Sequence, residues 1–333
     1  METRNHQLDN FKYILILLVV IGHFIEPLLD KIEWVRSFYV FIYLFHMPMF
    51  AFASGCLSKA KLDKKEMKQL FTSLVIPYFT LEVIFTVFDF LIFKKSTIEF
   101  SFLQPYWILW YLFSLLLWKV LAPFFYQLKY PIFFSFLIGL LSGMNGYGYN
   151  LSFSRTFVFF PFFLMGFLNY KNSFSNIEID RHAKTLFLST LLFALLAIFY
   201  FKDFNTINRW WLYGSASYSQ LNVDVLHGIA YRSMHYFLAF VLGTSLLFLT
   251  SKKKLFVSKI GANTLTIYIL HAFLVKYLQS TTFYQHVREE HVFLLILLSV
   301  LLVHLLATKP MIKIGDWIIH PIKKLKLEKY IFK

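Results

Sequence analysis

The chain has 333 residues, of which 58% are apolar and 21% aromatic, while only 15% are charged, against roughly 25% in a soluble globular domain. This composition excludes a soluble enzyme and predicts an all-α protein that crosses a membrane many times. A formal charge of +15 would favour nucleic-acid binding in a soluble chain. Here the Lys and Arg residues lie in the short gaps between apolar runs, where they set membrane topology, so we expect no nucleic-acid partner.

Apolar runs bounded by charged or turn-forming residues divide the chain into segments long enough to cross a bilayer core, which takes about 20 residues. We expect ten transmembrane helices in a single membrane domain that covers residues 1–333, followed within it by a basic cytoplasmic tail at 308–333. The ten predicted helices cover residues 11–29, 37–57, 69–93, 105–126, 130–147, 154–170, 184–201, 232–250, 260–278 and 291–307.

The distribution of Lys and Arg predicts the orientation of this bundle. With the N-terminus inside, the loops on the inner side carry roughly three times as many Lys and Arg residues as those on the outer side. Both termini are therefore predicted to be cytoplasmic, in a multi-pass protein of the bacterial cytoplasmic membrane. The longest connection, residues 202–231, is then external, and it either folds as a lid or re-entrant segment over the outer mouth or forms an aromatic belt loop.

The first predicted helix carries three ionisable residues in an otherwise apolar run: Lys12, His23 and Glu26. An ionisable side chain at membrane depth costs at least a few kcal/mol, so such residues usually face a bundle interior and mark a working site. Lys12 and His23 are separated by about three helical turns and Glu26 follows His23 by nearly one, so all three lie on one stripe. Lys12 is placed at the cytoplasmic surface and His23 beyond mid-depth.

Further polar residues lie within later predicted helices. His46 is near the middle of the second, His271 is in the ninth, Arg155 opens the sixth and Arg232 opens the eighth. Any single one could be a hydrogen-bonded packing residue, but the set favours a functional interior. Since no HxxxH pair occurs within one helix and the histidines would have to converge from different helices, we predict no metal site.

Aromatic residues open the fourth predicted helix in the segment PYWILWYL, which includes Trp107 and Trp110. These indoles could stack on sugar rings or anchor the helix at the membrane interface.

The sequence resembles acyltransferase family 3, the integral membrane acyltransferases. Lys12 followed by ten residues and His23 in VVIGH is similar to the Arg/Lys-x10-His signature of that family. The later segments FHMPMFAFASG, PYWILWYL, SRTFVFFPFFLMG and IGANTLTIYILH resemble, in order and spacing, its fucose 4-O-acetylase-like branch. The resemblance covers about residues 8–305. Two departures are a lysine where many members have arginine and the lack of an SGNH-type domain after the last helix, so the membrane domain is expected to deliver the acyl group itself or pass it to a partner.

The resemblance implies transfer of an acetyl group from cytoplasmic acetyl-CoA, the expected co-substrate, to a hydroxyl of a cell-surface or capsular polysaccharide or its lipid-linked precursor. In that scheme Lys12 holds the CoA phosphates, His23 is the general base, Glu26 orients its imidazole, and Arg155 stabilises the oxyanion or binds an acidic glycan. An acyl-imidazole relay on His23 is an open alternative. The residues expected to bind substrate are His46, Trp107, Trp110, Arg232 and His271.

Other functions use the same residues differently. A transporter or flippase of lipid-linked sugar would use the buried charges as a permeation path without a thioester donor. A capsule polymerase is a further enzyme alternative, and a structural scaffold would leave His23 and Arg155 unexplained. The expected partners are the bilayer, a glycan acceptor and proteins of envelope polysaccharide assembly.

Overall fold

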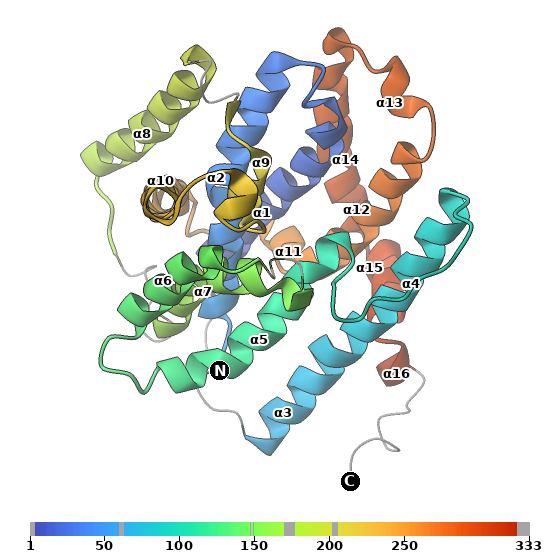
Figure 1. Ribbon diagram of the computed structural model, residues 1–333, viewed down its shortest axis with the longest axis horizontal. Coiled ribbons are helices and arrows are strands. Elements are labelled where there is room, and N and C mark those ends of the chain that lie inside the picture. Colours follow the sequence, from blue (N-terminus) through green and yellow to red (C-terminus); the bar gives the residue numbers. More distant parts are fainter. Residues whose placement is uncertain are drawn as a thin grey trace.

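The computed structural model describes residues 4–59, 63–146, 148, 150–169, 177–201 and 206–324, which are helical or irregular and contain no strand. Figure 1 shows the resulting helical bundle. Within these residues each of the ten predicted segments contains a helix, and eight of the helices are long and apolar enough to cross a membrane. The main helices are α1 His6–Ile25, α2 Glu33–Cys56, α3 Lys64–Leu70, α4 Ile76–Ile92, α5 Trp110–Phe125, α6 Pro131–Leu141, α7 Phe153–Leu168, α8 Arg181–Tyr200, α10 Val225–Leu249, α12 Thr264–Gln279 and α14 Val292–Leu306. The all-α polytopic fold predicted from the sequence is confirmed.

Helix boundaries differ from the prediction where polar residues supply local signals that hydropathy does not capture. α1 begins five residues early because the side chain of Asn5 caps it by accepting a hydrogen bond from the amide of Leu8. α3 and α4 form one continuous run joined by a π-helical turn, Phe71–Val75. Pro77 follows that turn, and because it has no amide hydrogen, it favours a locally widened helix.

α2 and α7 form a tightly packed pair of long helices. A Cβ atom added to Gly55 on α2 would lie 2.0 Å from the carbonyl oxygen of Phe163, and one added to Gly166 on α7 would lie 2.0 Å from that of Phe52. The two backbones are therefore in direct contact, as small residues permit in membrane helix pairs. These glycines end the FAFASG and FFLMG segments that the sequence resemblance singled out.

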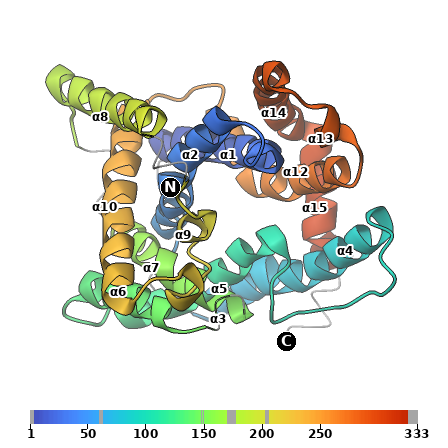
Figure 2. The same cartoon turned by 45° about the horizontal axis from the view of Figure 1, so that its top comes forward.

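The arrangement places α1, α2 and α7 in the interior and other helices around them (Figures 1 and 2). About two thirds of the apolar windows of α2 and α7 are buried within the protein, compared with 6% for α8. From Leu186 onward the exposed residues of α8 are mainly leucine and phenylalanine, as expected for a helix that faces lipid.

Successive helices that cross a membrane run in opposite directions, so their ends should gather on two faces of the bundle. Hydrogen bonds between distant segments identify these two faces. One, called here the basic face, joins the start of α1 to the end of α10, through the side chains of Gln7 and Asn10 and the backbone at residues 247–253. The other, called here the cavity face, joins the turn that follows α1 to two distant residues, through the hydrogen bonds from Tyr213 to Glu26 and from Lys31 to the backbone of Tyr284. The assignment of the basic face to the cytoplasm stays a prediction.

The predicted basic tail contains helical structure that hydropathy did not indicate. α15 Lys309–Ile319 packs against α12 and α4, and the short α16 Pro321–Lys324 follows it. Residues 325–333 of the predicted tail lie outside the described residues.

Candidate active site

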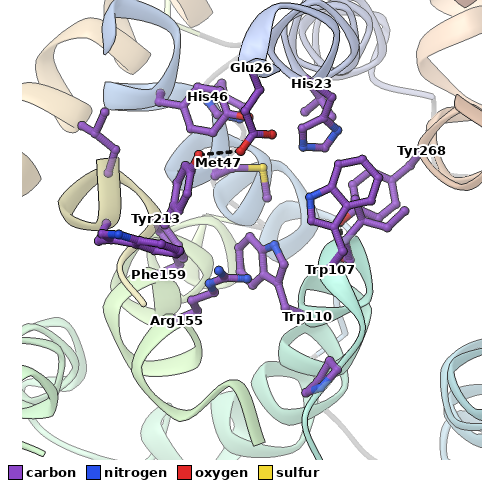
Figure 3. Close-up of a pocket in the computed structure, with 16 residues that line it drawn as sticks. His23, Glu26, His46, Met47, Trp107, Trp110, Arg155, Phe159, Tyr213 and Tyr268 are labelled. Carbon is purple, nitrogen blue, oxygen red and sulfur yellow. Dashed lines mark hydrogen bonds between the residues drawn. The ribbon is translucent and has the colours of Figure 1, made fainter. Parts of the chain in front are cut away.

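A cavity of about 210 Å³ opens among the helix ends on the cavity face. Figure 3 shows side chains from α1, α2, the start of α5, α7, α12 and the short helix α9 Arg209–Tyr213 converging on it. Six of the predicted site residues line it: His23, Glu26, His46, Trp107, Trp110 and Arg155.

His23 lies at the end of α1 and is half-buried, with its ring in the cavity wall. Its Nδ1 lies 2.8 Å from Nε2 of His271 on α12. The preceding residue, Gly22, leaves room for the ring of Tyr43, because a Cβ atom there would lie 2.8 Å from Tyr43 Cε2. The glycine of the VVIGH segment therefore allows α2 to bring an aromatic side chain beside His23.

Glu26 contacts a different partner from the one suggested by its spacing on the helix. Its Oε1 accepts a hydrogen bond of 2.8 Å from the hydroxyl of Tyr213 (Figure 3). The Tyr213 hydroxyl is itself 2.6 Å from the hydroxyl of Tyr39. Because Tyr213 belongs to α9 in the long connection, this bond fastens the connection over the cavity. Trp210 and Leu212 of the same segment complete that part of the wall.

Arg155 enters the cavity from the first turn of α7, on the side opposite His23 (Figure 3). Its guanidinium lies 5.1 Å from the ring centre of Trp110, which is within range of a cation–π contact. Two indoles and a guanidinium thus form one wall, and the end of α1 forms the other.

Trp107 is held in an unusual backbone conformation at the start of α5. Its φ of 28° is outside the regions that bulky residues normally adopt. Its indole lies 4.8 Å from the ring of His23, and the Nζ of Lys276 on α12 lies 4.7 Å from its centre. The strained turn places this ring between the imidazole and a cation.

His46 faces the cavity from α2 with its Nδ1 2.9 Å from the carbonyl oxygen of Ile42, one turn earlier. A carbonyl only accepts, so Nδ1 carries the hydrogen and a neutral His46 has Nε2 free as an acceptor.

Three predicted site residues do not line the cavity. His271 lies behind His23 and is fully buried. Arg232 is 2% exposed and contacts the end of α6 and the loop at 214–218, with the ring of Tyr218 4.9 Å from its guanidinium. Lys12 lies near the other end of α1, with its Nζ 3.3 Å from Asp9 Oδ1. Their proposed substrate contacts stay predictions.

Among the residues of the cavity wall that sequence reasoning missed are Tyr43, Met47, Trp210, Tyr213 and Tyr268. Two of them had a signal in the sequence, because Tyr43 precedes His46 and Tyr268 precedes His271 in the same Tyr-x-x-His spacing. Residues three apart share a helix face, so a tyrosine beside each interior histidine was predictable.

A second cavity of about 120 Å³ lies toward the basic face and shares Met47 and Tyr268 with the first. Its lining includes Ser54, near the end of α2, and Thr264, at the start of α12. Most of the remaining lining is apolar. The two cavities thus lie on either side of one methionine and one tyrosine.

In the part of the chain that the structure describes, no group of three His, Cys, Asp or Glu residues is arranged to hold a metal ion.

The fold and this site define a multi-pass membrane protein with a histidine-containing cavity between its helices. The family described as an acyltransferase domain matches residues 5–308. The chain therefore belongs to this family, acyltransferase family 3, which confirms the resemblance stated above at the level of the family. The branch within it stays a prediction.

The chain is also similar to the nodulation protein NolL of Mesorhizobium japonicum, with 31% identity over 139 residues. That alignment spans 37% of this chain and 37% of the relative. No solved structure matches the chain.

Proposed function

We propose that the protein transfers an acetyl group from acetyl-CoA to a hydroxyl of a cell-surface or capsular polysaccharide, or of its lipid-linked precursor, in the bacterial cytoplasmic membrane. The observation that carries this proposal is that His23 and Arg155 face each other across one aromatic-lined cavity. A base and a fixed cation on opposite sides of a confined space are the groups that acyl transfer needs.

The reaction assigns one task to each group. The acceptor hydroxyl oxygen attacks the thioester carbonyl carbon while His23 takes the hydroxyl proton. The guanidinium of Arg155 stabilises the negative charge that develops on the carbonyl oxygen. Collapse of the intermediate breaks the C–S bond, and His23 returns the proton to the sulfur, which leaves as the CoA thiol.

The second cavity supports a donor that enters from the basic face. Its mainly apolar lining suits the uncharged pantetheine arm, and a thioester bound beside Met47 and Tyr268 would lie between the two cavities that these residues share. Lys12 is proposed to contact the CoA phosphates from the same face, although its ammonium is paired with Asp9 in the structure.

The aromatic wall of the first cavity supports a sugar acceptor. Trp107, Trp110 and Trp210 present indole rings to the same space, and such rings stack on the apolar faces of sugars. The Glu26–Tyr213 bond would have to open for a glycan to enter past α9.

The test is transfer of radiolabelled acetyl from acetyl-CoA to candidate glycans by the purified protein in lipid nanodiscs. We expect label in the glycan, and a loss of about 10²- to 10³-fold in kcat for Arg155→Ala, with partial recovery in Arg155→Lys. Arg181→Ala, at an exposed position on α8, is the matched control and should keep full activity. Movement of a lipid-linked sugar across the bilayer without CoA would contradict the proposal and favour a flippase.

A further inference from the structure

His23 and His271 lie edge to edge rather than face to face. Their ring planes differ by 8° and their centres are 5.1 Å apart, while His23 Nδ1 and His271 Nε2 are only 2.8 Å apart. In parallel rings stacked face to face, the two nitrogens could not be this close while the centres are this far apart. The two rings therefore lie nearly in one plane, with a nitrogen of each ring pointing at a nitrogen of the other. This is the geometry of a hydrogen bond, in which one nitrogen must carry the hydrogen and the other must not.

The other ring nitrogen of His271, Nδ1, determines whether His23 or His271 donates the hydrogen in this bond. Its Nδ1 lies 2.9 Å from the carbonyl oxygen of Ile267, one turn earlier on α12. A carbonyl oxygen only accepts, so this Nδ1 carries a hydrogen. His271 is 0% exposed, and a charged imidazolium there would cost several kcal/mol, so the ring is neutral and its Nε2 is bare. His23 Nδ1 therefore donates to His271 Nε2.

We propose that His271 is a positioning residue that fixes His23 as its Nδ1–H tautomer. A neutral His23 of this form has a bare Nε2, which is the nitrogen left to the cavity that its ring lines. The chain from the Ile267 carbonyl through His271 to His23 thus selects the tautomer that can accept a proton. A buried carboxylate performs the same task behind the histidine of a hydrolase triad.

This assignment rests on the proposed function of His23 and adds a requirement to it. During transfer the proton of the acceptor hydroxyl moves to His23 Nε2. The resulting His23 imidazolium keeps its hydrogen bond from Nδ1–H to His271. The lone pair of His271 Nε2 then faces the positive charge on His23. The proton leaves again with the CoA sulfur, so His271 changes neither its own proton nor its bonds. The indole of Trp107, 4.8 Å away, restricts rotation of the His23 ring out of this plane.

A pair of variants separates positioning from packing. His271→Phe keeps an aromatic ring of similar shape and removes the acceptor, whereas His271→Gln places an amide oxygen near the position of Nε2 and keeps it. We expect kcat to fall by about 10² or more in His271→Phe, with the KM for acetyl-CoA unchanged, and at least tenfold recovery in His271→Gln. Full activity in His271→Phe, or equal losses in both variants, would overturn the proposal.

Nitrogen NMR of the ¹⁵N-histidine-labelled protein provides a readout that does not depend on turnover. The His23 signals, identified by their absence from His23→Gln, should show a protonated Nδ1 and a bare Nε2 in the resting protein, and this fixed pattern should be lost in His271→Phe. A protonated Nε2 on His23 in the unmodified protein would overturn the assignment. If the correct tautomer is present but no acetyl is transferred, the proposed function fails while the positioning role stands.

Discussion

Substitution of Gly166 by alanine tests whether the contact between α2 and α7 holds the cavity together. The added Cβ would lie 2.0 Å from the carbonyl oxygen of Phe52, about 1 Å closer than such contacts allow. The obstacle is backbone, so no side-chain rotation relieves it and the helices must separate. Overpacking of this kind costs about 1–3 kcal/mol or more, and with backbone on both sides we expect at least about 3 kcal/mol.

The separation would also displace the site, since α2 carries Tyr43 and His46 and α7 carries Arg155. Thermal unfolding in detergent should show a midpoint several degrees lower for Gly166→Ala, with a parallel loss of acetyl transfer. Gly146→Ala is the matched control, because a Cβ atom there meets nothing within 4 Å. An unfolding midpoint for Gly166→Ala equal to that of this control would refute the close-contact argument.

Three further predictions concern the donor, the lid and the orientation. Lys12→Ala should raise the Michaelis constant for acetyl-CoA about tenfold or more, since a charge-assisted contact contributes about 1.5–3 kcal/mol, and an unchanged constant would remove the donor role. Tyr213→Phe removes the donor to Glu26, so limited trypsin cleavage of the 206–224 segment should be several-fold faster; cleavage at the wild-type rate would show that the bond does not hold the lid. Cysteine labels at Lys64 and Gly146 should react only from the cytoplasm and only from outside, respectively, and outside labelling of Lys64 would overturn the predicted orientation.

The positions of the helices were predictable because each apolar run must satisfy its own backbone hydrogen bonds in lipid. Among the described residues each of the ten predicted segments contains a helix, although eight helices are long and apolar enough to cross a membrane and α6 is the short helix Pro131–Leu141. The segmentation did not anticipate α15 in the basic tail, because an 11-residue helix that packs one side against α12 and α4 needs one apolar side rather than an apolar run.

The charged and aromatic residues of the sequence were enough to predict part of the cavity lining. His23, Glu26 and Arg155 line the same cavity, as the cost of burying ionisable groups in a membrane indicates. The partners within the site were not predictable, since they depend on how separate helices rotate against one another. The i+3 spacing would allow Glu26 to contact His23. In the structure, however, Glu26 is hydrogen-bonded to Tyr213 and His23 to His271.

Arg232 illustrates the limit of reasoning from charge alone. A buried arginine in a membrane segment suggested a substrate contact, which stays a prediction, and the contacts seen in the structure are to backbone carbonyls at Gly139 and Ala216 and to the ring of Tyr218. Those partners come from loops whose approach to α10 no periodicity in the sequence reveals. The same charge can therefore join a loop to a helix as well as bind a ligand.

The central claim is that His23 acts as the base or acyl carrier in O-acetylation, and substitution by glutamine tests it most directly. Glutamine keeps hydrogen-bonding capacity near the position of the imidazole but cannot accept a proton at neutral pH. NMR of the surface glycan purified from a strain carrying only the His23→Gln protein should show the acetyl ester signals lost, or reduced by about 10²-fold or more, while the protein remains in the membrane at its normal level. Acetyl ester signals near the wild-type level in that strain would contradict the account.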